Sequence, residues 1–168
     1  FDARRERILV GAVGTSGTLS KLALWLDTCA KYIQPKVDSR QPTLYPAFCG
    51  FNLASGFKSS FIFRDEITRP LSNSEIRRIV KIKNWNDRVK EAVDLYYQQV
   101  KFLAQNRVVD VIVCIMPTEL YGKIARENSE PIEDVAVDDE PEDTVEVNFR
   151  RALKAKAMHL GKPLQLMR

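Results

Sequence analysis

Two cations and one amide near the end of the sequence have the chemistry and the spacing to hold an anion. Arg150 and Lys154 are four residues apart, so on a helix they lie on one face, one turn from each other. Two cations at this spacing repel by about 0.2–0.5 kcal/mol, and an anion bound between them reverses the sign. Gln165, eleven residues after Lys154, can donate an amide hydrogen bond to the same anion. The alternative is that the basic residues form only a solvated helix face.

The residues around this trio predict a short helix, a turn and a strand over 149–168. An apolar stripe recurs at near-helical spacing and consists of Phe149, Leu153, Ala157 and Leu160. Gly161 suits the position just past the end of a helix, and Pro163 prevents the helix from continuing. We therefore expect the two cations on a helix and Gln165 at the start of the strand that follows.

Earlier segments predict the sheet to which this strand belongs. Residues 7–13 (RILVGAV) and 108–116 (VVDVIVCIM) are short apolar runs, typical of parallel strands that are covered on both faces. Residues 60–63 (SFIF) predict a further strand, because aromatic and β-branched residues favour strands. The fold we expect is α/β and Rossmann-like, with a central, mostly parallel sheet and helices on both faces.

Three helices are expected among these strands. The first follows the first strand and buries an apolar stripe of Leu19, Leu22, Leu26, Cys29 and Ile33. A capping box, Ser72 to Glu75, introduces the second. The third begins near Asn86, and its apolar residues are Val89, Val93, Tyr96, Val100 and Leu103. The last two helices also carry Arg77, Arg78, Lys81, Lys83, Arg88, Lys90 and Lys101. These basic residues either are solvated or follow a nucleic-acid backbone.

Length and charge favour one globular domain with a basic working surface. The chain has 168 residues, enough for a single domain over 1–168, and no apolar run approaches the roughly 20 residues of a membrane span. Residues 127–146 contain ten acidic residues and no Lys or Arg, whereas residues 150–168 contain six Lys or Arg and no acid. We expect the first of these segments to form an acidic loop within the domain, beside a basic surface.

The cysteines and the single histidine argue against a metal site. Cys29, Cys49 and Cys114 have no CxxC spacing, and their odd number favours reduced thiols in a cytoplasmic setting. With one histidine and no paired thiols, zinc is not expected. The acids of 127–146 are too clustered to suit a two-metal nuclease, so we expect no catalytic set and no enzyme activity in this chain.

The segment at 149–168 resembles the 5′-phosphate pocket of the MID domain of Argonaute proteins, most of all the short prokaryotic (MID–PIWI) Argonautes. In that family an aromatic residue, His or Arg is followed after three residues by Lys, and a Pro-x-Gln opens the next strand. Here these positions are Arg150, Lys154 and Pro163-Leu164-Gln165, with Leu in place of the family's usual Thr.

Two further stretches, 46–51 (PAFCGF) and 117–121 (PTELY), resemble segments of the same domain. The resemblance implies that Arg150, Lys154 and Gln165 bind the 5′-phosphate and first nucleotide of a guide strand. RNA is favoured over DNA as the guide. Secondary contacts are expected from Arg151, Tyr121 and Lys123.

The resemblance also implies the surroundings of such a domain. A PIWI domain would follow it in a longer protein, of which this chain would be an excised part. The expected partners are a 5′-phosphorylated guide nucleic acid, a target DNA and an Argonaute-associated effector protein of TIR, SIR2 or nuclease type, acting in prokaryotic defence. No cofactor is expected in the chain itself, although Mg²⁺ is considered at the guide 5′-phosphate, and no membrane contact is expected.

Two other functions remain open from the sequence. Gly11, Gly14 and Gly17 form a GxxGxxG pattern, which would suit an α/β enzyme or small-nucleotide-binding domain. The pattern matches neither GxGxxG nor GxxxxGK[ST], and tight packing of a strand on a helix also explains these glycines. The acidic segment at 127–146 would instead suit a protein-interaction domain that meets a basic partner.

Overall fold

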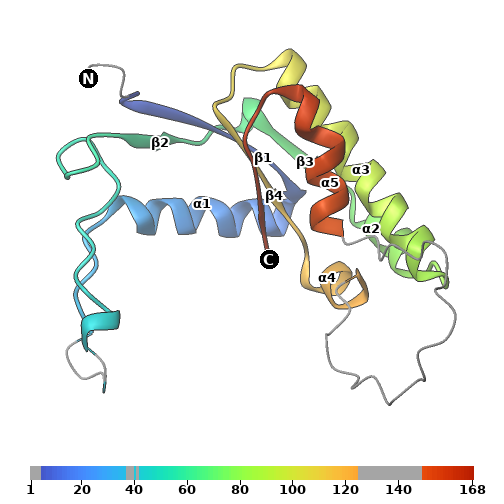
Figure 1. Cartoon of the computed structure of the whole chain (residues 1–168), viewed down its shortest axis with the longest axis horizontal. Coiled ribbons are helices and arrows are strands. Elements are labelled where there is room, and N and C mark those ends of the chain that lie inside the picture. Colours follow the sequence, from blue (N-terminus) through green and yellow to red (C-terminus); the bar gives the residue numbers. More distant parts are fainter. Residues whose placement is uncertain (1–4, 37–39, 41, 125–148) are drawn as a thin grey trace, which may run out of the picture.

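Figure 1 shows a computed structural model of the chain, which describes residues 5–36, 40, 42–124 and 149–168. The strands of this part are β1 (Arg7–Thr15), β2 (Ser60–Ile62), β3 (Thr68–Leu71), β4 (Val111–Ile115) and β5 (Leu164–Met167). The helices are α1 (Ser16–Ala30), α2 (Asn73–Val80), α3 (Trp85–Asn106), α4 (Thr118–Ile124) and α5 (Phe149–Ala157). Short 3₁₀ helices are η1 (Pro42–Leu44), η2 (Asp65–Ile67) and η3 (Met158–Leu160). The acidic loop predicted at 127–146 lies outside the described residues.

The strands form a five-stranded parallel sheet around β1, which agrees with the predicted α/β fold with a mostly parallel sheet. Its order is β2–β1–β4–β5, and β3 also pairs with β1. β2 and β3 share one side of β1, because β2 pairs with its first residues and β3 with its last. Every pairing of the described strands is parallel, so the strands all end at one end of the sheet. We call it the carboxyl end; there β1, β4 and β5 stop at Thr15, Ile115 and Met167.

Helices cover both faces of the sheet, and each face has its own apolar core. α1 lies on one face, where Leu19, Leu22 and Leu26 pack with Val10 and Val113. The other face carries α3 and α5, with α2 and α4 beside them (Figure 1). Its larger core includes Tyr96, Leu103, Ile112, Leu153 and Leu166. Burial on both faces explains why the sequences of β1 and β4 are almost continuously apolar.

Local sequence signals set several of the element boundaries. Ser72 and Glu75 form the predicted capping box at the start of α2. Gly161 follows η3 with a φ of 64°, the left-handed conformation that glycine adopts at least cost. The apolar stripe predicted for α3 is buried along its whole length, at Val89, Val93, Tyr96, Val100 and Leu103.

Three sequence-based expectations need correction. Ile33 does not continue the stripe of the first helix: α1 ends at Ala30, and Ile33 is exposed and pairs with Phe48 in an isolated antiparallel bridge. β3 is an additional strand, and it contains Pro70, which a strand tolerates at a sheet edge because no neighbour needs its missing N–H. α4 is an additional helix, and its seven residues are too few to give a periodic pattern.

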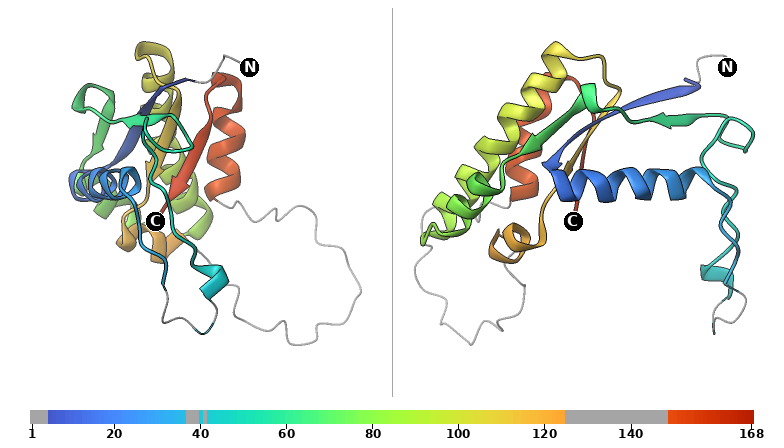
Figure 2. Two further views of the ribbon diagram at one scale, coloured as in Figure 1. Left: turned by 90° about the vertical axis from the view of Figure 1, so that its left-hand side faces the viewer. Right: turned by 180° about the vertical axis from the view of Figure 1, so that it is seen from behind.

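The described residues of the connection between α1 and β2 project away from the sheet, as both views in Figure 2 show. Near the end of this connection, the ring of Phe51 stacks on the ring of Phe61 in β2, with centroids 4.2 Å apart. This contact fixes the end of the connection to the sheet. Farther out, Leu44 and Tyr45 are exposed. Within the part of the chain that the structure describes, no helix has both the length and the apolar character needed to cross a membrane.

Candidate nucleic-acid interface

The predicted cation pair lies on α5. Arg150 and Lys154 are both exposed, one turn apart, and each directly follows a buried residue. These buried residues are Phe149 and Leu153, which pack into the core beneath α5. Because the apolar stripe fixes the rotation of the helix, it also holds both cations on a single flank.

That flank faces away from α3. Lys156 lies on the opposite flank, where it forms an ion pair with Asp94 of α3. Successive helix residues are rotated by about 100° around the helix axis. Lys156 comes one residue before buried Ala157 and so lies on one side of the apolar stripe. Arg150 and Lys154 each come one residue after a buried residue and so lie on the other side. Beyond α5 in this direction the described sheet ends at β5, and the left-hand view of Figure 2 shows α5 and β5 side by side. The pair therefore lies over the free edge of β5.

Gln165 reaches the same edge from the other face of the sheet. Leu166 is buried beneath α5, and side chains alternate along a strand, so Gln165 starts on the face of α1. Its Nε2 donates to the Leu166 carbonyl at 3.3 Å. That carbonyl points outward, because the alternate carbonyls of Pro163 and Met167 accept from β4. The structure thus places all three residues along β5, with the two cations on the face of α5 and Gln165 on the face of α1.

Among the predicted secondary contacts, Tyr121 lies at the carboxyl end of the sheet. It is half-buried on α4, and its hydroxyl accepts a hydrogen bond from Nη1 of Arg168 at 2.7 Å. Lys123, at the end of α4, and Arg151, on α5, are both exposed. Arg151 follows Arg150 by one residue and so points farther outward than the cation pair.

Arg168 is a candidate contact that the sequence-based hypothesis misses. It directly follows β5, and its guanidinium carbon lies 5.3 Å from the centroid of the Tyr121 ring. The signal that could have identified it is its position. A cation just after a predicted parallel strand lies where open α/β sheets bind their ligands.

Tyr96 ties the start of α5 to the carboxyl end of the sheet. Its ring meets that of Phe149 edge to face, with centroids 5.5 Å apart and planes at 81°. Its hydroxyl donates to the carbonyl of Ile115, the last residue of β4, at 2.8 Å. The beginning of α5, with Arg150, is therefore placed beside the end of β4.

The glycine pattern after residue 10 has a packing explanation. Gly11 and Gly14 lie inside β1, and a Cβ at Gly14 would come within 2.5 Å of Thr18 Oγ1 and 3.2 Å of the Ile115 carbonyl. The Thr15 side chain accepts from the Thr18 N–H and caps α1, so the strand runs directly into the helix. Within these described residues, no glycine-rich loop separates β1 from α1 to cradle a phosphate.

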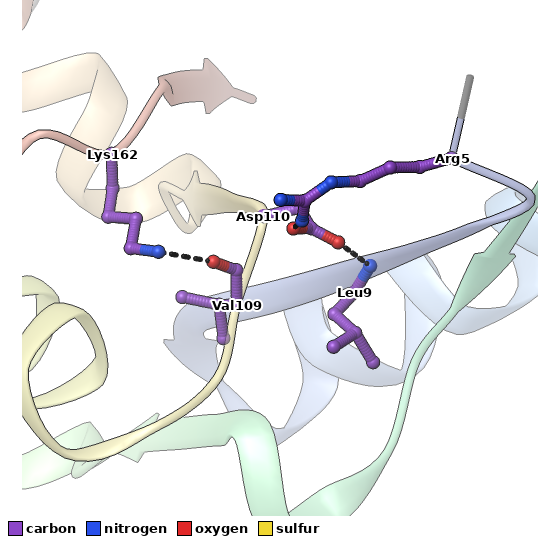
Figure 3. A network of polar contacts seen from close by, with 5 residues as sticks. All are labelled: Arg5, Leu9, Val109, Asp110 and Lys162. Carbon is purple, nitrogen blue, oxygen red and sulfur yellow. Dashed lines mark hydrogen bonds and ion pairs between the residues drawn. The ribbon is translucent and has the colours of Figure 1, made fainter. Parts of the chain in front are cut away.

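A hollow of about 480 Å³ lies at the opposite, amino end of the sheet. Figure 3 shows the polar contacts around it: Asp110 accepts from the Leu9 N–H at 2.9 Å and from Arg5, and Lys162 Nζ donates to the Val109 carbonyl at 2.8 Å. These contacts join the beginnings of β1 and β4 to the turn before β5. They stabilise the fold, and we assign no ligand to this hollow.

Two of the described cysteines, Cys29 and Cys114, are not suited to nucleophilic chemistry. Burial raises the pKa of the Cys114 thiol, which lies in the core against α3. Cys29 is only partly buried, and burial raises the pKa of its thiol as well. Both groups therefore keep their protons near neutral pH. Among the described residues, no group of three or more His, Cys, Asp or Glu side chains is placed to hold a metal ion.

No protein-family model matches the chain, and no curated protein matches it significantly.

Proposed function

We propose that this chain is a nucleic-acid-binding module that anchors the 5′-phosphate and first nucleotide of a guide strand, in the manner of the MID domain of a short prokaryotic Argonaute. The observation that carries the proposal is the cation pair on one flank of α5, over the free edge of β5. An anion bound between two cations that are held one turn apart offsets their mutual repulsion. A terminal phosphate carries close to two negative charges at neutral pH and suits such a pair.

Each residue of the trio has a distinct role in this proposal. Lys154 supplies a compact positive charge to the phosphate. Arg150 has a planar guanidinium that can stack on the first base and also reach the phosphate, so the site tolerates different bases. Gln165 donates its amide to a phosphate oxygen once the ligand replaces the Leu166 carbonyl as its acceptor.

The wider assembly belongs to the same proposal. The guide is RNA and pairs with a target DNA, Mg²⁺ accompanies the 5′-phosphate, and a PIWI domain completes the channel in the whole cytoplasmic protein. The chain itself has no enzymatic role, and a TIR, SIR2 or nuclease effector protein supplies the response to invading DNA. These statements rest on the resemblance of 149–168 to the Argonaute pocket.

The proposal is tested by titrating the complete protein with a short RNA that carries either a 5′-phosphate or a 5′-hydroxyl, at one salt concentration. We expect tighter binding of the phosphorylated strand, and we expect Arg150→Ala and Lys154→Glu to remove the preference. The control is Lys101→Glu, which makes the same charge change at an exposed position of α3 and leaves the preference intact. Equal affinity for both strands in the wild-type protein would reject the proposal.

A further inference from the structure

Arg168 is oriented by an uncharged partner. Its Nη1 donates to the Tyr121 hydroxyl at 2.7 Å, and its guanidinium carbon is 5.3 Å from the centroid of that ring. Elsewhere on the described surface, carboxylates form ion pairs with Arg5, Lys31, Arg78 and Lys156. The contact with Tyr121 sets the direction of the Arg168 side chain without bringing a negative charge to it. Its attraction for an anion is therefore not offset by this contact.

Arg168 also lies at the end of the sheet where α5 begins. The Met116 N–H donates to the Met167 carbonyl at 3.0 Å, which fixes the residue before Arg168 beside the end of β4. Tyr96 holds the start of α5, and with it Arg150, at the end of the same strand. Two arginines from different elements thus approach the end of β4, one from β5 and one from α5.

We propose that Arg168, positioned by Tyr121, binds a phosphodiester group of the guide strand next to the anchored 5′-phosphate. This inference rests on the proposed function. In this proposal the strand runs from the cation pair toward the carboxyl end of the sheet, where Arg168 lies just after β5. A guanidinium has five N–H donors, and Tyr121 takes one of them, so a bidentate contact with two phosphodiester oxygens remains available. Such a contact follows the backbone and does not read the base.

The test measures the affinity of the complete protein for 5′-phosphate and 5′-hydroxyl RNA over a range of salt concentrations. In Arg168→Ala we expect both affinities to fall by about tenfold, with the ratio between the two strands unchanged. The slope of log affinity against log salt should become shallower by about 0.7, the value for one contact to a single strand. Lys36→Ala removes a cation from the distant projection between α1 and β2 and is the matched control, with affinity and slope unchanged.

Two further variants separate the charge of Arg168 from its position. Tyr121→Phe keeps the ring and the cation but removes the hydrogen bond. We expect it to lower both affinities by a few-fold with the wild-type salt slope retained. Arg168→Lys keeps the charge and the slope but loses the bidentate geometry, so its affinity should lie between those of the wild type and Arg168→Ala.

The outcomes distinguish this inference from the proposed function. If Arg168→Ala leaves both affinities and the slope unchanged while Lys154→Glu removes the phosphate preference, the inference is wrong and the anchoring function stands. If Arg168→Ala removes the preference itself, Arg168 contacts the terminal phosphate and the inference is again wrong. If the wild-type protein shows no phosphate preference, the proposed function fails, and the response of the 5′-hydroxyl strand to Arg168→Ala still decides whether Arg168 binds the backbone.

Discussion

Arg88 of α3 donates from Nη1 to the backbone carbonyl of Lys123, the penultimate residue of α4, at 2.8 Å. Its Nε donates to the carbonyl of Ile82, just after α2, at 2.9 Å. One guanidinium therefore caps the carboxyl end of α4, where unpaired carbonyls carry partial negative charge, and holds the chain that follows α2. Although Arg88 belongs to the basic face of α3, it is a structural residue of the described fold.

This contact predicts a loss of stability when Arg88 is replaced. Arg88→Ala removes these hydrogen bonds, together with those from Nη2 to the Ile82 and Lys83 carbonyls, and should lower the free energy of unfolding by about 1–3 kcal/mol. Lys90→Ala, at a neighbouring exposed position of α3, should change it by less than about 0.5 kcal/mol. Urea denaturation measures both values. A similar small effect in the two variants would contradict the structural role of Arg88.

The hydrogen bond between Tyr96 and Ile115 predicts a second loss of stability. Tyr96→Phe keeps the edge-to-face contact with Phe149 but leaves the buried Ile115 carbonyl without this donor. We expect a decrease of about 1–3 kcal/mol in the free energy of unfolding, with the 5′-phosphate preference retained. Phe149→Ala should cost more, about 3–5 kcal/mol, because it leaves a cavity under the start of α5. Thermal unfolding of the two variants tests this order.

Burial of Cys114 predicts destabilisation at alkaline pH. Burial raises the pKa of this thiol above its ordinary value of 9.0, so the unfolded chain releases the proton first. Its contribution to stability is complete below pH 9 and is lost as the pH rises above that value, by about 1.4 kcal/mol per pH unit. In Cys114→Ala the decline between pH 9 and 10 should be shallower. Cys49→Ala, at an exposed position, should retain the wild-type decline.

The glycines of β1 and α1 predict opposite effects at two nearby positions. Gly14→Ala places a Cβ 2.5 Å from Thr18 Oγ1 and 3.2 Å from the Ile115 carbonyl, so it should destabilise the fold by about 1–3 kcal/mol. Gly17→Ala meets no atom within 4 Å and should stabilise α1 by about 0.4–1 kcal/mol. A small-nucleotide site at this turn would instead require Gly17→Ala to reduce nucleotide binding, which calorimetric titration would detect.

Periodicity in the sequence predicts the elements that are buried on well-defined faces. β1 and β4 are continuous apolar runs because helices cover both faces of the sheet, and α3 shows its core stripe over several turns. The same rule fails for α4 and β3, which are too short to show a period, and β3 contains Pro70.

The candidate site is predicted in part for the same reason. Helical spacing correctly places Arg150 and Lys154 on one flank of α5. It cannot place Gln165, because the face of a strand residue depends on register with its neighbour; pairing with Val113 puts Gln165 on the α1 face. The contact of Arg168 with Tyr121 joins residues 47 positions apart, which no local pattern reveals.

The most direct test of the central claim is to locate the 5′-phosphate on the protein. Amide chemical shifts of the isotopically labelled protein would be followed during titration with a short 5′-phosphorylated RNA, and the 5′-hydroxyl RNA would be subtracted as the reference. We predict that the phosphate-dependent shifts concentrate at Arg150, Lys154 and Gln165. Shifts concentrated instead at Gly11 to Gly17, or none that depend on the phosphate, would contradict the claim that α5 and β5 form a guide-anchoring site.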